Sequence, residues 1–378
     1  MAALAIACGS DDSSNDAPPL EVFTGTVEEF YVVPDPLNEG EPGEIIRIQY
    51  VADSAEATTL RIMYHSRDAR DRDRAVTGIL TYPHAAPPDG GWPVVSLANG
   101  TVGLASPCAL SRRGRAAPTF GVDGVGVVTD YIGLGPVGEI HPYLSRPSEA
   151  HSVIDAVRAA RNLPEAGAGR RWLAIGHSQG GHAALATNEL AADYAPELEL
   201  LGTISLAPAA LFDRSYDGID PIVTHVVGVM LFYGASYEHP EIVFEDYVSA
   251  EGVEASRVIE DRCLDDIINS VLTVPVDSFY DESPLDTEPA RSILLGNDVG
   301  GVRAESPLLL IGGTADQTVV IDRVRDLLDE LCAVDQVTEY VELEGATHDT
   351  EYALGAEHIE DWFAARLTGD PPIDACAE

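Results

Sequence analysis

The sequence predicts an α/β fold, in which a mostly parallel central sheet is flanked by helices and carries an inserted, mainly helical cap. Three observations predict it. Short apolar runs typical of buried strands alternate with segments whose apolar residues recur at helical spacing. One apolar run ends at a glycine-flanked serine that leads directly into an alanine-rich helical segment. Residues 212–303 break the alternation with helix-like, proline-punctuated sequence. Strands that alternate with helices imply a sheet covered on both faces.

The N-terminal residues 1–19 are rich in Ser, Asp and Pro, which is typical of a disordered tether. Cys8 follows small apolar residues and precedes a polar stretch, as at the end of a bacterial lipoprotein signal. No positively charged segment precedes it, so the sequence would begin inside its own signal. A lipidated Cys8 is the route to membrane association that we expect, since no stretch approaches the roughly 20 apolar residues of a membrane span.

Short alternating strands follow between residues 23 and 83, and the clearest are 44–51 and 59–64. Residues 68–74 alternate acidic and basic side chains ahead of a further strand, which predicts a polar hairpin turn. This turn lacks the glycine and the distal glutamate of a calcium loop, so we expect no metal site in it.

From Pro93 onward the elements are those of a parallel sheet with its helices. The expected strands are 94–98, 126–131, the run ending at Gly176, 200–207, 307–312 and 337–343, and the expected helices are 149–163, the segment after Ser178, 321–331 and 356–367. The core is therefore expected over 20–211 and 304–378, with the cap as an insertion over 212–303. The alternative for the insertion is an ordinary helical excursion that packs elsewhere.

Charge restricts the possible partners. The chain of 378 residues has 22 basic residues, all of them arginine, and 63 acidic ones, for a net charge of −41. Nucleic-acid binding is not expected, because phosphates are neutralised by basic clusters. Adsorption to anionic lipid is disfavoured for the same reason. The acidic excess fits either a salty habitat, where self-repulsion is screened, or compositional drift in a lysine-poor proteome.

The cysteine count indicates an exported protein. Apart from Cys8, the sequence has Cys108, Cys263, Cys332 and Cys376. An even set suits two disulfides in an oxidising compartment, and three pairings are open. The alternative is four reduced, buried thiols in a cytosolic enzyme.

The central motif is Gly176-His177-Ser178-Gln179-Gly180. Between a buried strand and a helix, Gly-x-Ser-x-Gly acts as a nucleophile elbow. The turn is so tight that positions two before and two after the serine crowd each other, which glycine tolerates. Ser178 would then project above the N-terminus of the helix, whose free N–H groups stabilise a developing oxyanion. The alternative is a glycine-rich corner with an incidental serine.

A serine hydroxyl needs a base, and the base needs an acid that orients it. In enzymes with such a nucleophile elbow, the catalytic acid follows the serine in the sequence and the histidine comes last. Asp316 comes directly after the strand at 307–312, and His348 follows the strand that ends near Leu343. We therefore expect Ser178, Asp316 and His348 to form a catalytic triad.

Other acids and histidines are weaker candidates. Asp322 and Asp349 are secondary choices for the acid. His358 is expected to pack or to face solvent on the last helix, and His177 and His182 to be pocket-wall or helix-surface residues.

An oxyanion hole needs two N–H donors. Gln179, the residue after the nucleophile, would supply one. Thr101, in the loop after the strand at 94–98, would supply the other, with Gly100 permitting close backbone approach. Asn99-Gly100-Thr101 also matches a glycosylation sequon, but such a loop would be buried, so we reject that interpretation.

Together these residues resemble the secretory lipase family of α/β-hydrolases, the group that includes Candida antarctica lipase A. The resemblance rests on Gly176-His177-Ser178-Gln179-Gly180-Gly181, Asp130-Tyr131-Ile132-Gly133-Leu134-Gly135, His141-Pro142-Tyr143-Leu144, Cys108, Asp316 and His348, with Asn99-Gly100-Thr101 where family members often have His-Gly-Thr. It covers roughly residues 20–376. It implies an α/β-hydrolase fold, a helical cap over the serine, and the disulfides Cys108–Cys263 and Cys332–Cys376.

The sequence thus predicts an exported serine carboxylic-ester hydrolase, secreted or lipid-anchored at the bacterial cell envelope, that forms an acyl-enzyme and acts on lipids, short acyl esters or polyesters. No metal or organic cofactor is expected. One alternative is an acyltransferase with the same triad, and another is a catalytically silent binding protein of the same fold.

Overall fold

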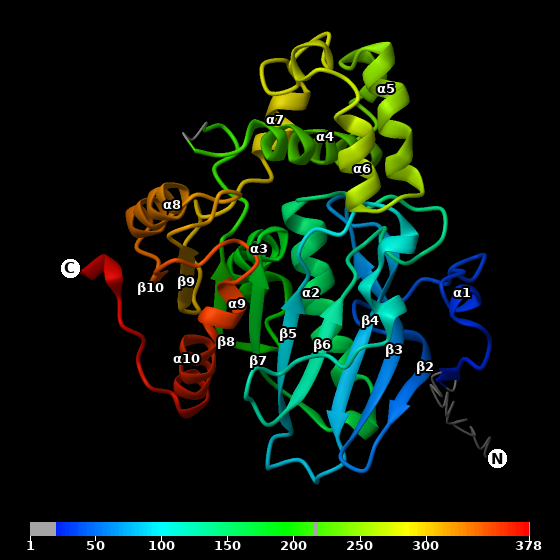
Figure 1. Cartoon of the computed structure of the whole chain (residues 1–378). Coiled ribbons are helices and arrows are strands. Elements are labelled where there is room, and N and C mark those ends of the chain that lie inside the picture. Colours follow the sequence, from blue (N-terminus) through cyan, green and yellow to red (C-terminus); the bar gives the residue numbers. More distant parts are fainter. Residues whose placement is uncertain (1–19, 215–217, 378) are drawn as a thin grey trace, which may run out of the picture.

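A ten-stranded sheet forms the centre of the molecule (Figure 1). The computed structural model describes residues 20–214 and 218–377, so the expected tether and Cys8 lie outside the described residues. The strand order is β1-β2-β3-β4-β6-β5-β7-β8-β9-β10. The strands are β1 (Glu21–Val22), β2 (Ile45–Asp53), β3 (Ala57–Arg67), β4 (Asp73–Pro83), β5 (Trp92–Ala98), β6 (Val125–Thr129), β7 (Ala168–His177), β8 (Glu199–Leu206), β9 (Leu308–Gly313) and β10 (Thr338–Leu343).

The pairing divides the sheet into two parts. Strands β2, β3, β4 and β6 pair antiparallel in that order. From β6 through β5, β7, β8 and β9 to β10 every pair is parallel. Parallel strands bring their carboxyl ends to one edge of the sheet, and that edge faces the cap in Figure 1. The expected α/β-hydrolase fold with a mostly parallel sheet is confirmed.

The described helices pack on both faces of the sheet and in the insertion above it. They are α1 (Val27–Phe30), α2 (Arg146–Arg161), α3 (Gln179–Tyr194), α4 (Pro221–Glu238), α5 (Ala250–Ser256), α6 (Leu264–Val271), α7 (Ala290–Leu295), α8 (Ile321–Ala333), α9 (Glu351–Leu354) and α10 (Ala356–Thr368). Side chains alternate across strand β7, so Trp172 packs on the α2 side and Leu173 packs with Trp362 of α10 on the other.

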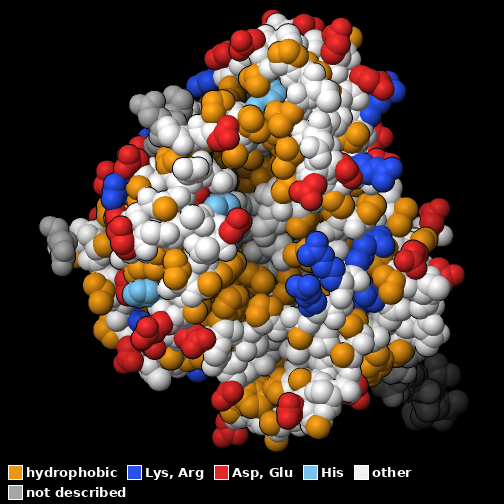
Figure 2. Space-filling view, viewed as in Figure 1, with side chains coloured by type: hydrophobic (Ala, Val, Ile, Leu, Met, Phe, Trp, Pro, Cys, Tyr) orange, Lys and Arg blue, Asp and Glu red, His pale blue; other side chains and the backbone are white. Residues whose placement is uncertain are grey.

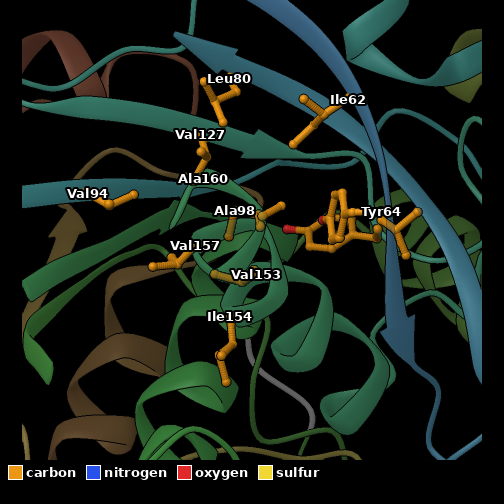
Figure 3. Close-up of a cluster of buried hydrophobic side chains, with 14 of the residues drawn as sticks. Ile62, Tyr64, Leu80, Val94, Ala98, Val127, Val153, Ile154, Val157 and Ala160 are labelled. Carbon is orange, nitrogen blue, oxygen red and sulfur yellow. The ribbon is translucent and has the colours of Figure 1, made fainter. Parts of the chain in front are cut away.

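Helix α2 packs against the sheet in the largest cluster of buried apolar side chains. Its buried stripe, which includes Val153 and Val157, packs on side chains of several strands (Figure 3). These strand residues are Ile62, Tyr64, Leu80, Val94, Ala98 and Val127. Burying a side chain of this size stabilises the fold by about 1.5–3 kcal/mol, so this stripe holds the sheet and helix in one fixed relation.

The insertion between β8 and β9 contains α4, α5, α6 and α7, which lie above the sheet in Figure 1. It has an apolar cluster of its own, in which Phe232, Ile267 and Phe279 are fully buried. The Cys108–Cys263 disulfide joins this insertion to the core, and Leu264 N–H donates to the Val102 carbonyl. The insertion is thus fixed to the loop that follows β5.

Most expected strands and helices occur within a few residues of their expected bounds, and the two cysteine pairs are those that the family resemblance implies, Cys108–Cys263 and Cys332–Cys376. One strand is shorter than expected, because β6 ends at Thr129 and leaves Asp130 and Tyr131 in the following loop. The sequence analysis made no separate prediction for the short elements β1, α1 and α9. No described helix is long and apolar enough to cross a membrane.

Candidate active site

Ser178 occupies a sharp turn between β7 and α3, at the carboxyl edge of the parallel strands. Its φ of 60° and ψ of −119° lie outside the regions that L-residues ordinarily adopt. A Cβ on Gly176 would overlap the Gly180 carbonyl oxygen, and a Cβ on Gly180 would overlap that of Ala98. Both glycines are therefore sterically required, and the half-buried serine side chain projects from a strained backbone.

Asp316 and His348 come together beyond the neighbouring strands β9 and β10. His348 Nδ1 lies 2.7 Å from Asp316 Oδ2, while Asp316 Oδ1 accepts the N–H groups of Thr318 and Val319. Burial raises the pKa of Asp316, but the hydrogen bond and charge of His348 and the two N–H groups outweigh burial and lower it. A carboxylate at this position accepts the proton of Nδ1, so Nε2 is the ring nitrogen that can act as a base.

The serine and the imidazole lie near each other without a hydrogen bond. The ring of His177, the residue before Ser178, is 4.4 Å from the ring of His348, centroid to centroid. Among the described residues the Ser178 hydroxyl forms no hydrogen bond. The base is thus beside the elbow, but its link to the serine is not made in this conformation.

The expected oxyanion donors come from two elements, the start of α3 and the loop after β5. Gln179 is the first residue of α3, where backbone N–H groups have no partner within the helix. Thr101 is held by a 2.8 Å hydrogen bond between its Oγ1 and the hydroxyl of Tyr143. We expected Gly100 to permit a close backbone approach. Within the protein this is wrong, because a Cβ on Gly100 would meet only the His177 carbonyl oxygen, at an ordinary 3.5 Å.

The loop after β6 supports the loop that carries Thr101. Tyr131 has a φ of 66° and donates from its hydroxyl to the Asn99 carbonyl at 2.8 Å. Asn99 Nδ2 donates to the Thr129 carbonyl. A Cβ on Gly133 would overlap the Ile140 carbonyl, so that glycine is needed where the loop after β6 folds back on itself. The Asp130–Gly135 motif therefore positions the loop that follows β5.

Glu351, at the start of α9, is a site residue that the sequence analysis missed. It is fully buried, and its Oε1 accepts a 2.8 Å hydrogen bond from Gly313 N–H. Burial and the negative charge of Asp316 raise its pKa to about 8, which favours the neutral carboxyl at pH 7. No periodicity distinguishes this glutamate from the exposed acidic residues around it.

His177 faces the same carboxyl. Its Nε2 lies 3.6 Å from Glu351 Oε2, and neither atom has a hydrogen-bond partner among the described residues. Burial, followed by the charge of His348, lowers the pKa of His177 to about 4. The ring is therefore neutral, and this contact is not an ion pair.

The remaining candidates lie apart from this group. Asp322, Asp349 and His358 are exposed. His182 is fully buried, so our expectation of a pocket-wall or helix-surface residue is wrong for it. Helix α2 and the segment after α7 cover α3 at His182, whose ring contacts Glu149 and the Asn297 carbonyl. Across residues 20–214 and 218–377, no three His, Cys, Asp or Glu side chains are grouped to hold a metal ion.

Figure 2 shows the molecule hollowed between the insertion and the sheet, with hydrophobic side chains along the hollow and acidic ones scattered over the surrounding surface. Pockets at such junctions bury apolar ligand groups and orient them with a few polar ones. The arrangement therefore suits a ligand with an apolar portion.

Comparison with known proteins places the chain in a family. A model of the secretory lipase family matches residues 122–375. The closed state of Candida antarctica lipase A is similar, with a TM-score of 0.75 at 18% identity, covering 92% of this chain and 87% of that one. The rice cell wall degrading esterase LipA from Xanthomonas oryzae gives a TM-score of 0.72 at 18% identity, covering 88% of this chain and 100% of that one.

A curated relative from Mycobacterium tuberculosis, named a probable inactive lipase, is 20% identical over 373 residues, which cover 91% of this chain and 83% of the relative. The two structural similarities establish the fold, and the family model spans most of the chain, from the loop before β6 almost to the C-terminus. The chain is a member of the secretory lipase family.

Proposed function

We propose that the protein is an exported serine carboxylic-ester hydrolase that works through an acyl-enzyme. The observation that carries the proposal is the 2.7 Å hydrogen bond from His348 to a buried, ionised Asp316, beside a serine held at positive φ. A base oriented by an acid next to a strained serine is the arrangement that makes a hydroxyl nucleophilic.

In the proposed reaction, Ser178 Oγ attacks the acyl carbonyl and His348 Nε2 takes its proton. Asp316 keeps the imidazole in the required tautomer and stabilises the imidazolium. The N–H groups of Gln179 and Thr101 stabilise the oxyanion, and His348 then protonates the leaving alcohol. Water repeats the sequence to release the acid. The hydrogen bond from Ser178 to His348 would form on substrate binding, since such bonds often tighten only in the complex.

The proposed substrates are esters with an apolar acyl part, from short acyl esters to lipids or a polyester chain. The hollow under the insertion, with its hydrophobic walls, supports this class. The two disulfides and the family support export. Lipid anchoring at Cys8 stays a proposal, as does the absence of nucleic-acid partners, for which the net charge of −41 is the support.

Hydrolysis rates test the proposal directly. We expect the wild-type chain to cleave nitrophenyl esters of increasing acyl length, assayed alongside emulsified triglyceride. Ser178→Ala should lose at least about 10³-fold in kcat and keep its circular dichroism spectrum. Ser54→Ala, in the exposed turn between β2 and β3, is the matched control and should hydrolyse normally. Full activity in Ser178→Ala would overturn the assignment.

The second candidate is a catalytically silent protein of the same fold. Two observations favour it: the missing hydrogen bond from Ser178 to His348, and the relative named a probable inactive lipase. A fluorophosphonate probe separates the candidates, because only an activated serine reacts with it.

A further inference from the structure

Four buried polar side chains cluster around the first turn of α3, which begins directly after Ser178. They are His141 from the loop after β6, Glu149 from α2, and Gln179 and His182 from the first turn of α3. None of them is more than 1% exposed. The proposed chemistry makes no use of these side chains, and a buried polar group is costly unless it is fully hydrogen-bonded.

Glu149 is the centre of the cluster. Its Oε1 accepts from Gln179 Nε2 at 2.7 Å and from Leu144 N–H at 3.0 Å, and its Oε2 lies 2.9 Å from His182 Nδ1. Burial raises the pKa of Glu149, but hydrogen bonds from His141 and His182 outweigh burial and lower it to about 2. Glu149 is therefore an ionised carboxylate in the interior.

His182 has the contacts of an imidazolium. Its Nδ1 contacts the Glu149 carboxylate, and its Nε2 lies 2.8 Å from the backbone carbonyl oxygen of Asn297. The Asn297 carbonyl can only accept, and an ionised Glu149 can only accept as well, so this geometry favours protons on both ring nitrogens. Burial lowers the pKa of His182, but the hydrogen bond and charge of Glu149 raise it by more. The result is a buried ion pair.

The same cluster fixes the Gln179 side chain. Gln179 Nε2 donates to Glu149 and lies 2.7 Å from Nε2 of His141. His141 Nδ1 lies 2.8 Å from the Ile132 carbonyl oxygen, and its Nε2 also lies 3.4 Å from Glu149 Oε1. The Gln179 amide nitrogen is thus held between Glu149 and His141, although its Oε1 has no hydrogen-bond partner among the described residues, and this fixes the side chain of the first residue of α3.

Asn297 extends the cluster to the segment that returns from the insertion to β9. Its carbonyl accepts from His182, and its Oδ1 accepts the backbone N–H of Arg146 at 2.9 Å, next to the start of α2. The ion pair therefore connects three elements: α2, α3 and the returning segment.

We propose that the Glu149–His182 ion pair is a positioning device that holds the backbone N–H of Gln179 toward the reacting carbonyl and ties it to the segment returning from the cap. This inference rests on the proposed function, in which that N–H stabilises the oxyanion. Glu149 touches no reacting atom and acts through Gln179.

Steady-state kinetics of Glu149→Gln test the role. With the charge removed, His182 keeps one ring proton and can donate to only one of its two partners, so we expect Gln179 to be less well held. We expect kcat on a nitrophenyl ester to fall at least about tenfold, with KM within about twofold, because losing an oxyanion donor outright costs about 10²–10³. The rate of fluorophosphonate labelling should fall in parallel.

Asp155→Asn is the matched control. Asp155 is also fully buried on α2 and is paired with Arg158, but its partners lie away from the elbow. This variant should lose stability while kcat and KM stay within about twofold of wild type. A Glu149→Gln variant that keeps wild-type kcat, or that loses no more than Asp155→Asn, would overturn the positioning role.

A spectroscopic readout tests the ion pair independently of activity. Nitrogen-15 NMR of the histidine side chains at pH 7 should show both His182 nitrogens protonated in the wild type and one of them deprotonated in Glu149→Gln. A singly protonated His182 in the wild type would disprove the inference. If the wild type neither hydrolyses esters nor reacts with the probe, the proposed function fails, whereas the spectra still decide whether the ion pair exists.

Discussion

Two fully buried glutamates near Ser178 each lie close to an imidazole: Glu149 beside His182, which we call the oxyanion side after the proposed role of Gln179, and Glu351 beside His177, which we call the base side. The two carboxyls differ in charge. On the oxyanion side, hydrogen bonds from His182 and His141 hold Glu149 ionised. On the base side, Glu351 lies beside the ionised Asp316 and keeps its proton. Burial alone would neutralise both, so the neighbouring donors and charges decide which carboxyl ionises.

The difference has a chemical consequence for the proposed reaction. On the oxyanion side a fixed ion pair holds a neutral N–H donor in place without adding net charge. On the base side a second carboxylate would compete with Asp316 for His348, whereas a neutral Glu351 adds no charge. The base side therefore has one negative carboxylate, Asp316, hydrogen-bonded to the His348 imidazole.

Asp316→Asn gives the largest effect on the base side. We expect kcat to fall on the order of 10⁴-fold, since an amide can stabilise the wrong tautomer of His348 and cannot balance the imidazolium. The rate of ester hydrolysis at saturating substrate concentration measures this kcat. Asp322→Asn, at an exposed position on α8, should leave kcat unchanged. Comparable losses in both variants would remove Asp316 from the proposed triad.

Glu351→Gln tests the neutral carboxyl through stability. The pKa of Glu351 is raised from its ordinary 4.5 to about 8, so between these pH values the folded chain keeps a proton that the unfolded chain releases. This group's contribution to stability is complete below pH 4.5 and is lost as pH rises to 8, on the order of 4 kcal/mol in all.

A glutamine at position 351 has nearly the same shape as the glutamic acid side chain and does not ionise. The Tm of Glu351→Gln relative to wild type should therefore rise by several degrees between pH 5 and pH 8, as followed by calorimetry. Glu357→Gln, at an exposed position on α10, should show no such trend. A Tm difference independent of pH would mean that Glu351 is ionised in the folded protein, and the contrast with Glu149 would disappear.

His177→Phe should have the smallest effect. The His177 ring is neutral, and its Nε2 has no hydrogen-bond partner among the described residues, so phenylalanine keeps the packing against His348 and loses no bond at that atom. We expect kcat/KM on a nitrophenyl ester to stay within about threefold of wild type. A tenfold loss would assign His177 a direct role on the base side.

The sequence predicted the parallel half of the sheet because its strands are continuous apolar runs, as in the segment before Gly176. It also located Asp316 and His348, since each follows a strand whose end is marked by glycine or polar residues. Glu149 and Glu351 could not be found in this way. Glu149 lies on the buried stripe of α2, and its partners come from α3 and from a loop that only the folded chain brings together.

The insertion shows the same limit. Its helices were expected as a group, but the bounds of α4 to α7 depend on packing around Phe232 and Phe279 rather than on a repeating strand–helix pattern. The shape of the hollow beneath it follows from that packing, and local sequence carries little information about it.

The central claim is that Ser178 is an activated nucleophile. Intact-mass and peptide mass spectrometry after incubation with a fluorophosphonate test it most directly, with Ser178→Ala as the control. The account predicts a single adduct that maps to Ser178 in the wild type and none in the variant. A wild-type chain that stays unlabelled, or an adduct on another residue, would contradict it.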